Sequence, residues 1–224
     1  AVQLPADSLM PGHLRLPRGA NVEKLPGFGE GAWWVQDIAA SLPARLLGPG
    51  EGRHVLDLCA APGGKTLQLA AQGWQVTALD ISKRRLDLLK ANLKRTGLKA
   101  GAVRADALKW EPKHTFDAIL LDAPCTATGT ARRHPDVLHR IGPEAIEQMA
   151  QLQAALLRRA QGWLKPGGTL VYATCSLERA EGEDQAGAVS LTPDPITRDG
   201  LPQGVEPGSA GWLRTGPGML EEHG

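Results

Sequence analysis

The sequence predicts an α/β fold in which a mostly parallel sheet carries helices on both faces, preceded by a small N-terminal appendage. Short apolar runs, often β-branched, each end in Asp, Cys or Gly, which is typical of strands buried on both faces. Segments with helical spacing of apolar residues lie between these runs, and this alternation produces parallel strands joined by right-handed crossovers. A chain of 224 residues with 42% hydrophobic content can bury one main core.

The first 50 residues are rich in Pro and Gly and show no sustained period before Gln36. Beyond that point apolar residues recur at helical spacing, at Ile38, Leu42 and Leu46. We therefore expect residues 1 to 50 to form the appendage and a first helix, and residues 51 to 224 to form the main domain.

Five apolar runs are the expected strands. They are VLDLC (55 to 59), VTALD (76 to 80), AVRAD (102 to 106), FDAILLD (116 to 122) and TLVYATC (169 to 175). In parallel sheets, ligands bind beyond the carboxyl ends of the strands. The residues that end these runs are therefore the candidates for function.

Three helices are expected between the strands. One follows the first strand over residues 66 to 72, and a second is capped by Ser82 and ends at Gly97. A third spans residues 143 to 163, with Pro at its first position and LKPGG at its exit. After residue 181, Pro and Gly interrupt the chain every few residues, so we expect loop with at most one short strand.

Charge and cysteine content exclude several classes of protein. Twenty-five Lys and Arg against twenty-four Asp and Glu give a net charge of +1, so any nucleic-acid surface has to be a local patch. Three cysteines without a CxxC pair fit neither a disulfide framework nor a four-ligand zinc site. We expect a cytoplasmic protein without a metal, and the absence of a leader or a long apolar run predicts neither export nor membrane spanning.

The densest motif is DLCAAPGGKT, which lies where the first strand turns into the first helix of the main domain. Glycines let the backbone approach a ligand, and the helix N-terminus offers N–H donors to a carboxylate or phosphate. Position 59 is Cys where a Walker A loop needs Gly, and no GxGxxG is present. S-adenosyl-L-methionine remains as the cofactor that suits this turn.

Two further acids end strands on the cofactor side. Asp80 follows Asp57 by 23 positions, close to the roughly 20-residue spacing at which an acid meets ribose hydroxyls. Asp106 ends the third run and is placed to accept from the adenine amino group. A single strand-ending Asp is more often a cap or turn residue, but three in register with a glycine turn favour a cofactor site.

The candidate chemistry lies in Asp122-Ala123-Pro124-Cys125 and Thr174-Cys175-Ser176, which end two strands that we expect to be neighbours. Cytosine C5 is a poor nucleophile, and a thiolate that adds to C6 activates it by covalent catalysis. Such a site needs a low-pKa thiolate, an acid at N3 and a second group that assists elimination. Cys175, Asp122 and Cys125 supply these types. The residues alone do not rank the two cysteines, and each by itself is more often a small buried hydrophobe.

The motifs DLCAAPGGKT, DAPCTATGTARRHPD and YATCS resemble those of the NOL1/NOP2/Sun family of RNA (cytosine-5) methyltransferases, above all its bacterial Fmu/RsmB group acting on 16S ribosomal RNA. The similarity extends over residues 27 to 185 and includes GFGEGAWWVQD. It implies a Rossmann-like class I methyltransferase fold and methyl transfer to C5 of a cytosine in RNA. It also implies that Cys175 is the nucleophile and that Cys125 helps to release the product.

The resemblance further implies which residues line the cofactor pocket. They are Cys59, Ala60, Ala61, Pro62, Gly63, Gly64, Lys65, Asp80, Asp106 and Asp122. Family members of this group usually carry an N-terminal helical RNA-binding domain and a further C-terminal strand. The chain starts without Met and stops at Gly224, so we expect it to be a fragment or the ordered part of a longer protein.

RNA contacts are expected just after the DAPC turn, from Arg132, Arg133 and His134. Such residues bind phosphates, which set position more than sequence. Because a duplex hides C5 and C6 from a thiol, the target cytosine should be single-stranded or flipped out. We expect the protein to act as a monomer.

The sequence bears on four alternatives in function or substrate. A zinc cytosine deaminase needs HxE and PCxxC, which are absent. A non-catalytic RNA-binding module on the same fold would not need cysteines at both strand ends. In the DNA version of the reaction the PC-motif cysteine attacks, which the family motif argues against. A transfer RNA or large-subunit ribosomal RNA stays open as the substrate.

Overall fold

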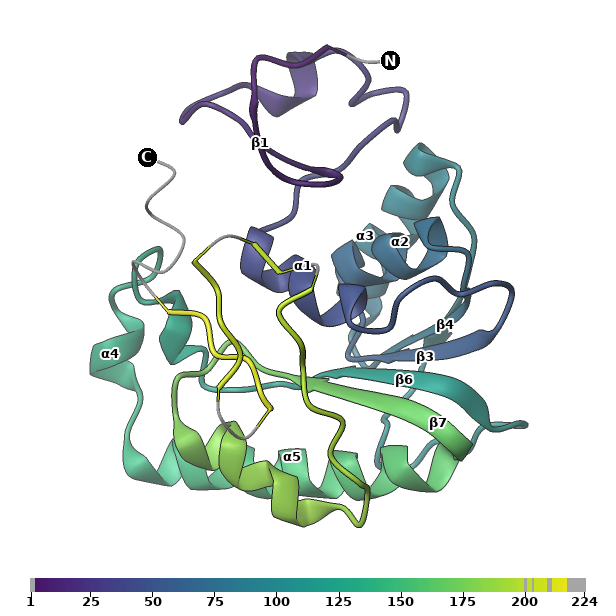
Figure 1. Cartoon of the computed structure of the whole chain (residues 1–224), viewed down its shortest axis with the longest axis vertical. Helices are drawn as coiled ribbons and strands as arrows, with labels where there is room; N and C mark the ends of the chain where they lie inside the picture. The colour runs from purple at the N-terminus through teal and green to yellow at the C-terminus, as the bar shows by residue number, and fades with distance from the viewer. Residues whose placement is uncertain (1–2, 200, 203, 209–210, 217–224) are drawn as a thin grey trace.

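The protein, a computed structural model, is described for residues 3–199, 201–202, 204–208 and 211–216. Five parallel strands form one sheet in the order β5-β4-β3-β6-β7, and all four pairings between neighbours are parallel (Figure 1). The strands are β3 His54–Leu58, β4 Gln75–Asp80, β5 Ala100–Arg104, β6 Phe116–Asp122 and β7 Leu164–Ala173. The predicted parallel α/β sheet is confirmed.

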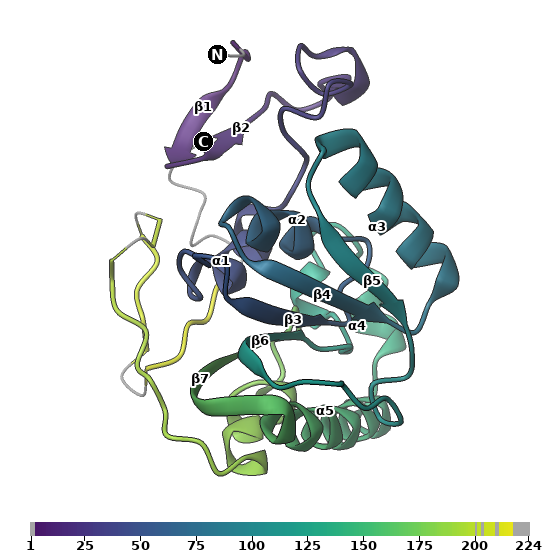
Figure 2. The ribbon, with the colours of Figure 1, turned by 90° about the vertical axis from the view of Figure 1, so that its right-hand side faces the viewer.

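Helices cover both faces of this sheet. Figures 1 and 2 show α1, α2 and α3 on one face and α5 on the other. Their bounds are α1 Ile38–Arg45, α2 Gly64–Ala71, α3 Lys83–Thr96 and α5 Pro143–Trp163, with a short α4 at Val137–Arg140. The predicted caps of α3 are confirmed, because Ser82 Oγ accepts from Arg85 N and Gly97 is left-handed.

The hydrophobic core is split by the sheet into two layers. The α5 side packs Leu156, Leu157, Ala160 and Trp163 against β3 and β6. On the other side, the apolar residues of α2 and α3 pack on β3 and β4, among them Leu67, Leu69, Leu86, Leu89 and Leu93. Strands buried on both faces explain why their sequences read as continuous apolar runs.

Several sequence expectations need correction. The third strand ends at Arg104 rather than Asp106, whose carboxylate instead accepts from Leu108 N at 2.9 Å in the following loop. The LKPGG segment belongs to β7 and not to a loop. Local hydrogen bonding explains the first difference, since Asp readily closes a turn with its own side chain.

The two ends of the chain contain short elements that the sequence did not predict. The appendage contains a hairpin, β1 Asp7–Met10 with β2 His13–Arg15, and a 3-10 turn η1 at Val22–Lys24. After β7 the chain forms η3 Arg179–Glu181 and η4 Glu183–Ala188, and no strand occurs in the described residues beyond them. A further 3-10 turn, η2, covers Thr128–Thr130. Among the described residues, no helix has the length and apolar character needed to cross a membrane.

The fold predicts a sharp difference between core and surface substitutions. Leu120→Ala removes a fully buried side chain from the interior strand β6 and should cost about 2–5 kcal/mol of unfolding free energy. Leu88→Ala, at a side chain 51% exposed on α3, should change stability by no more than about 0.5 kcal/mol. Urea unfolding followed by circular dichroism measures both, and equal midpoints would contradict the assignment of the core.

Candidate functional site

The carboxyl ends of β3, β6 and β7 meet at one edge of the sheet and carry the candidate residues. The turn after β3 holds the glycines, the loop after β6 holds Cys125, and the loop after β7 holds Cys175. Because β6 pairs with both β3 and β7, sequence segments more than 100 residues apart converge here. The expectation that the two cysteine-bearing strands are neighbours is confirmed.

The turn between β3 and α2 is shaped by Gly63. Its φ is 109°, in the left-handed region, and a Cβ there would lie 2.9 Å from Leu89 Cγ. Arg85 donates to the carbonyl oxygen of Ala61 on the same turn. A cavity of about 420 Å³ adjoins the turn and is lined on this side by Ala60 to Lys65.

Asp80 supports this turn from behind. Its carboxylate is 2% exposed and accepts from Ala61 N at 3.1 Å and from Ser82 N at 2.8 Å. Asp80 and Asp106 are not among the residues that line the cavity, whereas Asp122 is. The structure thus places Asp122 on the cavity wall and Asp80 behind the turn, in contact with Ala61 N, whereas Asp106 lies in the loop after β5.

Asp57, which is fully buried in β3, and Cys59, which directly follows that strand, lie at the base of the turn. Burial raises the pKa of the Cys59 thiol to about 12, and the nearby Asp80 adds to this effect. Burial likewise raises the pKa of Asp57 to about 7, although Thr66 donates to its carboxylate at 2.5 Å. A thiol with such a high pKa is a poor nucleophile, so the reactive candidates are the other two cysteines.

Cys125 and Cys175 are free thiols in contact with each other, with Sγ atoms 3.4 Å apart. A hydrogen bond from Cys125 lowers the pKa of Cys175 to about 7, and the same bond, followed by burial, raises the pKa of Cys125. Cys175 is the exposed member of the pair. The greater exposure of Cys175 and its lowered pKa make it the better candidate for the thiolate, with Cys125 as its hydrogen-bond partner.

A salt bridge lies beside the two thiols. Lys65 Nζ donates to Asp122 Oδ2 at 2.8 Å, which links the glycine turn to the end of β6. The two charges act in opposite directions on Cys175, since Asp122 raises its pKa and Lys65 lowers it. Both residues line the cavity at the turn and also a larger cleft, so this pair forms a wall between the two spaces.

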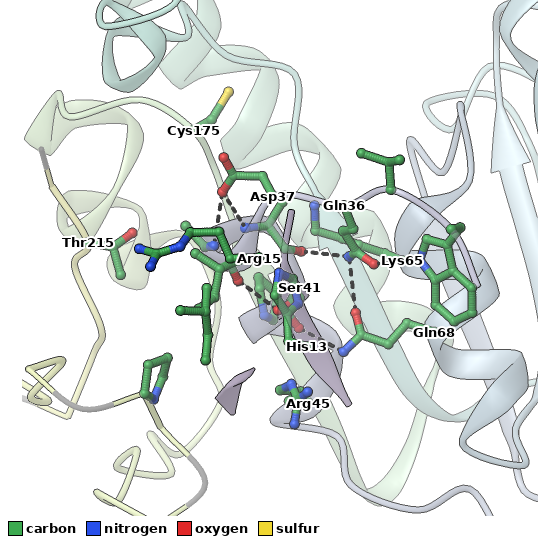
Figure 3. Close-up of a pocket in the computed structure, with 18 of the residues that line it drawn as sticks. His13, Arg15, Gln36, Asp37, Ser41, Arg45, Lys65, Gln68, Cys175 and Thr215 are labelled. Carbon is green, nitrogen blue, oxygen red and sulfur yellow. Dashed lines mark hydrogen bonds between the residues drawn. The ribbon is translucent and has the colours of Figure 1, made fainter. Parts of the chain in front are cut away.

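The larger cleft has a volume of about 1380 Å³ and contains Cys175 (Figure 3). The appendage and α1 form one side of it, and the loops after β6 and β7 form the other. Arg132 and Arg133 line the cleft, and Arg133 lies 3.5 Å from the Asp37 carboxylate. His134 is exposed but does not line it.

The wall contributed by residues 28 to 36 was missed as a site element. Phe28, Trp34 and Gln36 line the cavity together with the glycine turn. Gln36 donates to Gln68 Oε1 on α2 at 3.1 Å, and Arg95 on α3 donates to the Phe28 carbonyl oxygen at 2.6 Å. The motif GFGEGAWWVQD in this segment supported the family resemblance, but it did not indicate where the segment lies relative to the cofactor turn.

Comparison with known families matches residues 44–193 to the 16S rRNA methyltransferase RsmB/F family. Ribosomal RNA small subunit methyltransferase B of Klebsiella pneumoniae subsp. pneumoniae is 49% identical over 191 residues, which cover 82% of this chain and 44% of that protein. The chain spans about half the length of the curated relatives it matches.

Solved structures share the fold. The crystal structure of NSun6 from Pyrococcus horikoshii with SFG has a TM-score of 0.69 and 36% identity, covering 78% of this chain and 45% of that one. A methyltransferase homolog protein from the same organism has a TM-score of 0.67 and 35% identity, covering 77% and 55%. The expected class I methyltransferase fold is thereby confirmed.

The thiol pair predicts a shift in reactivity on substitution. Cys125→Ala removes the hydrogen-bond donor, so the pKa of Cys175 should rise from about 7 toward 9.0, the ordinary thiol value. Cys125→Ser keeps a donor and should shift the pKa less. The rate of Cys175 alkylation by iodoacetamide as a function of pH, read by peptide mass spectrometry, measures this. Cys59→Ala is the control, and a profile unchanged in Cys125→Ala would refute the pairing.

Proposed function

The chain belongs to the 16S rRNA methyltransferase RsmB/F family, and on that premise we propose that it transfers a methyl group from S-adenosyl-L-methionine to C5 of a cytosine in 16S ribosomal RNA. One observation carries the proposal. Two thiols 3.4 Å apart, with the pKa of the exposed one lowered, lie beside a Lys65–Asp122 pair that separates a small cavity from a large cleft. This arrangement suits a methyl donor on one side and a base on the other.

The residues of the turn fit the cofactor. Gly63 and Gly64 leave the backbone open at the N-terminus of α2, where the first N–H groups lack intrahelical acceptors and suit a carboxylate. The acids at the ends of β3, β4 and β6 suit a positive charge. When bound, S-adenosyl-L-methionine supplies a methyl group on a sulfonium. We assign its pocket to Cys59 to Lys65 and Asp122, with Asp80 and Asp106 as ligands of its ribose and adenine.

The first chemical step is addition of Cys175 to the base. The thiolate gives its electron pair to C6 and forms a C–S bond, and Asp122 passes a proton from its partner Lys65 to N3, where charge would otherwise build up. The lowered pKa of Cys175 keeps the thiolate available near neutral pH. C5 then carries the electron density with which it takes the methyl group.

The second step releases the product. Once Cys175 is bonded to C6, Cys125 loses its proton to water and, as a thiolate, removes the proton from C5. The electrons of that C–H bond restore the C5–C6 double bond, and the C6–S bond breaks with its pair returning to Cys175. N3 returns its proton through Asp122 to Lys65, so the proton that Cys125 gave to water is the one released overall. Cys125 is within reach because it contacts the sulfur that is bonded to C6.

The large cleft is proposed to take up the RNA. Arg132 and Arg133 line it and can bind phosphates, with His134 exposed next to them. We propose that the target cytosine enters single-stranded or flipped out, since a stacked base does not present C6 to a thiol. In this scheme residues 1–50 contribute to RNA contacts, residues 51–224 form the catalytic domain, and the protein works in the cytoplasm as a monomer.

The roles of the two cysteines predict opposite results for their variants. With 16S ribosomal RNA and S-adenosyl-L-methionine, Cys175→Ala should abolish methyl transfer without an adduct. Cys125→Ala should accumulate a covalent protein–RNA species, because addition proceeds and elimination does not. Denaturing gels and transfer of a labelled methyl group measure both. An adduct in Cys175→Ala with an inert Cys125→Ala would reverse the assignment.

The cofactor assignment predicts a binding defect at Asp80. Asp80→Asn replaces a carboxylate that orders the turn through Ala61 N and that we assign to ribose, so affinity for S-adenosyl-L-methionine should fall about tenfold or more. Isothermal titration calorimetry measures the affinity. Asp87→Asn, an exposed acid on α3, is the matched control, and equal affinities of the two variants would remove Asp80 from the site.

A further inference from the structure

A fully buried carboxylate lies behind the two cysteine loops. Glu181, in η3, is 0% exposed. Its Oε1 accepts from the hydroxyls of Thr126 and Ser176, the latter at 2.7 Å, and its Oε2 accepts from Thr126 N and from Gln153 Nε2, both at 2.9 Å. Every contact is a donated hydrogen bond, as a carboxylate requires.

The donors come from separate parts of the fold. Thr126 directly follows Cys125, and Ser176 directly follows Cys175. Gln153 lies on α5 and also donates to the Pro124 carbonyl oxygen at 2.8 Å. Among the described side chains, only Glu181 is therefore bonded to both Thr126 and Ser176. Gln153 on α5 holds the Glu181 carboxylate through a further hydrogen bond.

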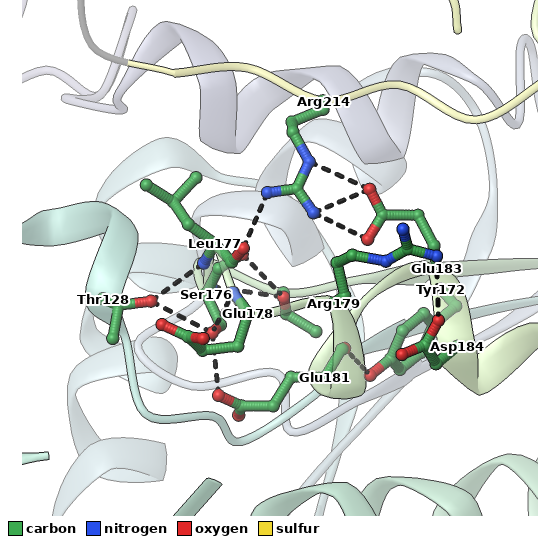
Figure 4. Close-up of polar contacts among 11 residues, drawn as sticks. Thr128, Tyr172, Ser176, Leu177, Glu178, Arg179, Glu181, Glu183, Asp184 and Arg214 are labelled. Carbon is green, nitrogen blue, oxygen red and sulfur yellow. Dashed lines mark hydrogen bonds and ion pairs between the residues drawn. The ribbon is translucent and has the colours of Figure 1, made fainter. Parts of the chain in front are cut away.

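Other contacts around Glu181 hold the loops together (Figure 4). Gly129 N donates to the Cys175 carbonyl oxygen at 3.0 Å, and Leu177 N donates to Thr128 Oγ1 at 2.9 Å. Tyr172 donates to the Glu181 carbonyl oxygen at 2.6 Å. The first two of these bonds join the two loops to each other, as do the contacts of Ser176 Oγ with Thr126 Oγ1 and Thr128 Oγ1, both at 3.2 Å. The Glu181 carboxylate adds a shared acceptor for the residues that follow the two cysteines.

Glu181 has no cationic partner among the described residues, because its four hydrogen bonds all come from neutral groups. A buried carboxylate without a counter-ion is costly to desolvate, and apolar packing would stabilise the fold at lower cost. The desolvation cost of a buried carboxylate is therefore expected at a place where the positions of its hydrogen-bond partners matter for the chemistry.

We propose that Glu181 is a positioning residue that holds the Cys125 and Cys175 loops at the separation at which the two thiols touch. This role rests on the proposed function but concerns a step before any substrate binds. Loss of the carboxylate takes the shared acceptor from Thr126 and Ser176, and the two cysteines that precede them then move apart although other bonds still join the loops.

The consequence appears in the titration of Cys175. The groups that act on its thiol are Cys125, Asp122 and Lys65, and Arg132 and Arg133 line the same cleft. The contact with Cys125 is a direct one, at 3.4 Å between the two Sγ atoms, so it is the most sensitive to the separation of the two loops. A purely structural role for Glu181 predicts lower stability with an unchanged pH profile in the folded protein, whereas the positioning role predicts a shifted profile.

The experiment measures the rate of Cys175 alkylation by iodoacetamide against pH in the folded chain, with folding checked by circular dichroism. In Glu181→Ala the apparent pKa of Cys175 should rise by at least about one unit, so the rate at pH 7 should fall about fivefold and match wild type at high pH. Glu181→Gln keeps acceptors for Thr126 N and Gln153 and should shift the profile less.

The matched control is Glu178→Ala, which removes the same charge from the Cys175 loop. Its carboxylate makes no hydrogen bond with the residues described by the structure, and its profile should equal that of wild type. Ser176→Ala cuts the link from the Cys175 loop to Glu181, together with the Ser176 Oγ contacts to the Thr126 and Thr128 hydroxyls and to Glu178 N. It should move the profile upward even if Glu181→Ala fails to fold. A wild-type profile in folded Glu181→Ala or in Ser176→Ala would overturn the proposal.

This assay needs neither RNA nor cofactor. If wild type fails to methylate RNA while the Glu181 variants still shift the titration of Cys175, the proposed function is wrong and the positioning role stands. If wild type methylates RNA and the titration does not move, the positioning role alone is wrong.

Discussion

The register between β6 and β7 is the constraint on which the site depends. Asp122 pairs with Ala173 across these parallel strands, and Ala123 N donates to the Ala173 carbonyl oxygen at 2.9 Å just beyond them. Each strand then continues by two or three residues to its cysteine. A slip of one residue would turn every side chain to the opposite face of the sheet, and both the core against α5 and the thiol contact would be lost.

Electrostatics at this edge follow from the same convergence. Asp57, Asp80 and Asp122 all end strands there and together raise the pKa of the buried Cys59 thiol, in addition to the larger effect of burial. Lys65 and Arg85 offset part of this negative charge. The pKa of Cys175 is lowered instead, because Cys125 supplies a hydrogen bond to its sulfur. Cys59 and Cys175, which both lie near these acids, therefore differ in reactivity because only Cys175 contacts Cys125.

The five strands and several helix ends could be predicted from the sequence, because the local residue patterns agree with the elements that form. Apolar runs gave the five strands, and Ser82, Gly97 and Pro143 mark helix ends through their own backbone chemistry. The prediction that Asp106 ends a strand was wrong, because an Asp that closes a turn follows an apolar run in the sequence just as a strand-ending Asp does. Glu181 could not be found, since ERAEGED reads as a solvated segment and only tertiary contacts bury one of its acids.

The wall that residues 28 to 36 add to the small cavity lies before the segment that matches the family, residues 44–193. Gln36 and Arg95 fasten this wall to α2 and α3 by hydrogen bonds. A chimera that exchanged only the family-matched segment between relatives would therefore combine one parent's glycine turn with the other parent's aromatic cover. A segment exchanged to transfer ligand specificity therefore has to begin before Phe28, so that the glycine turn and the wall of residues 28 to 36 come from the same parent.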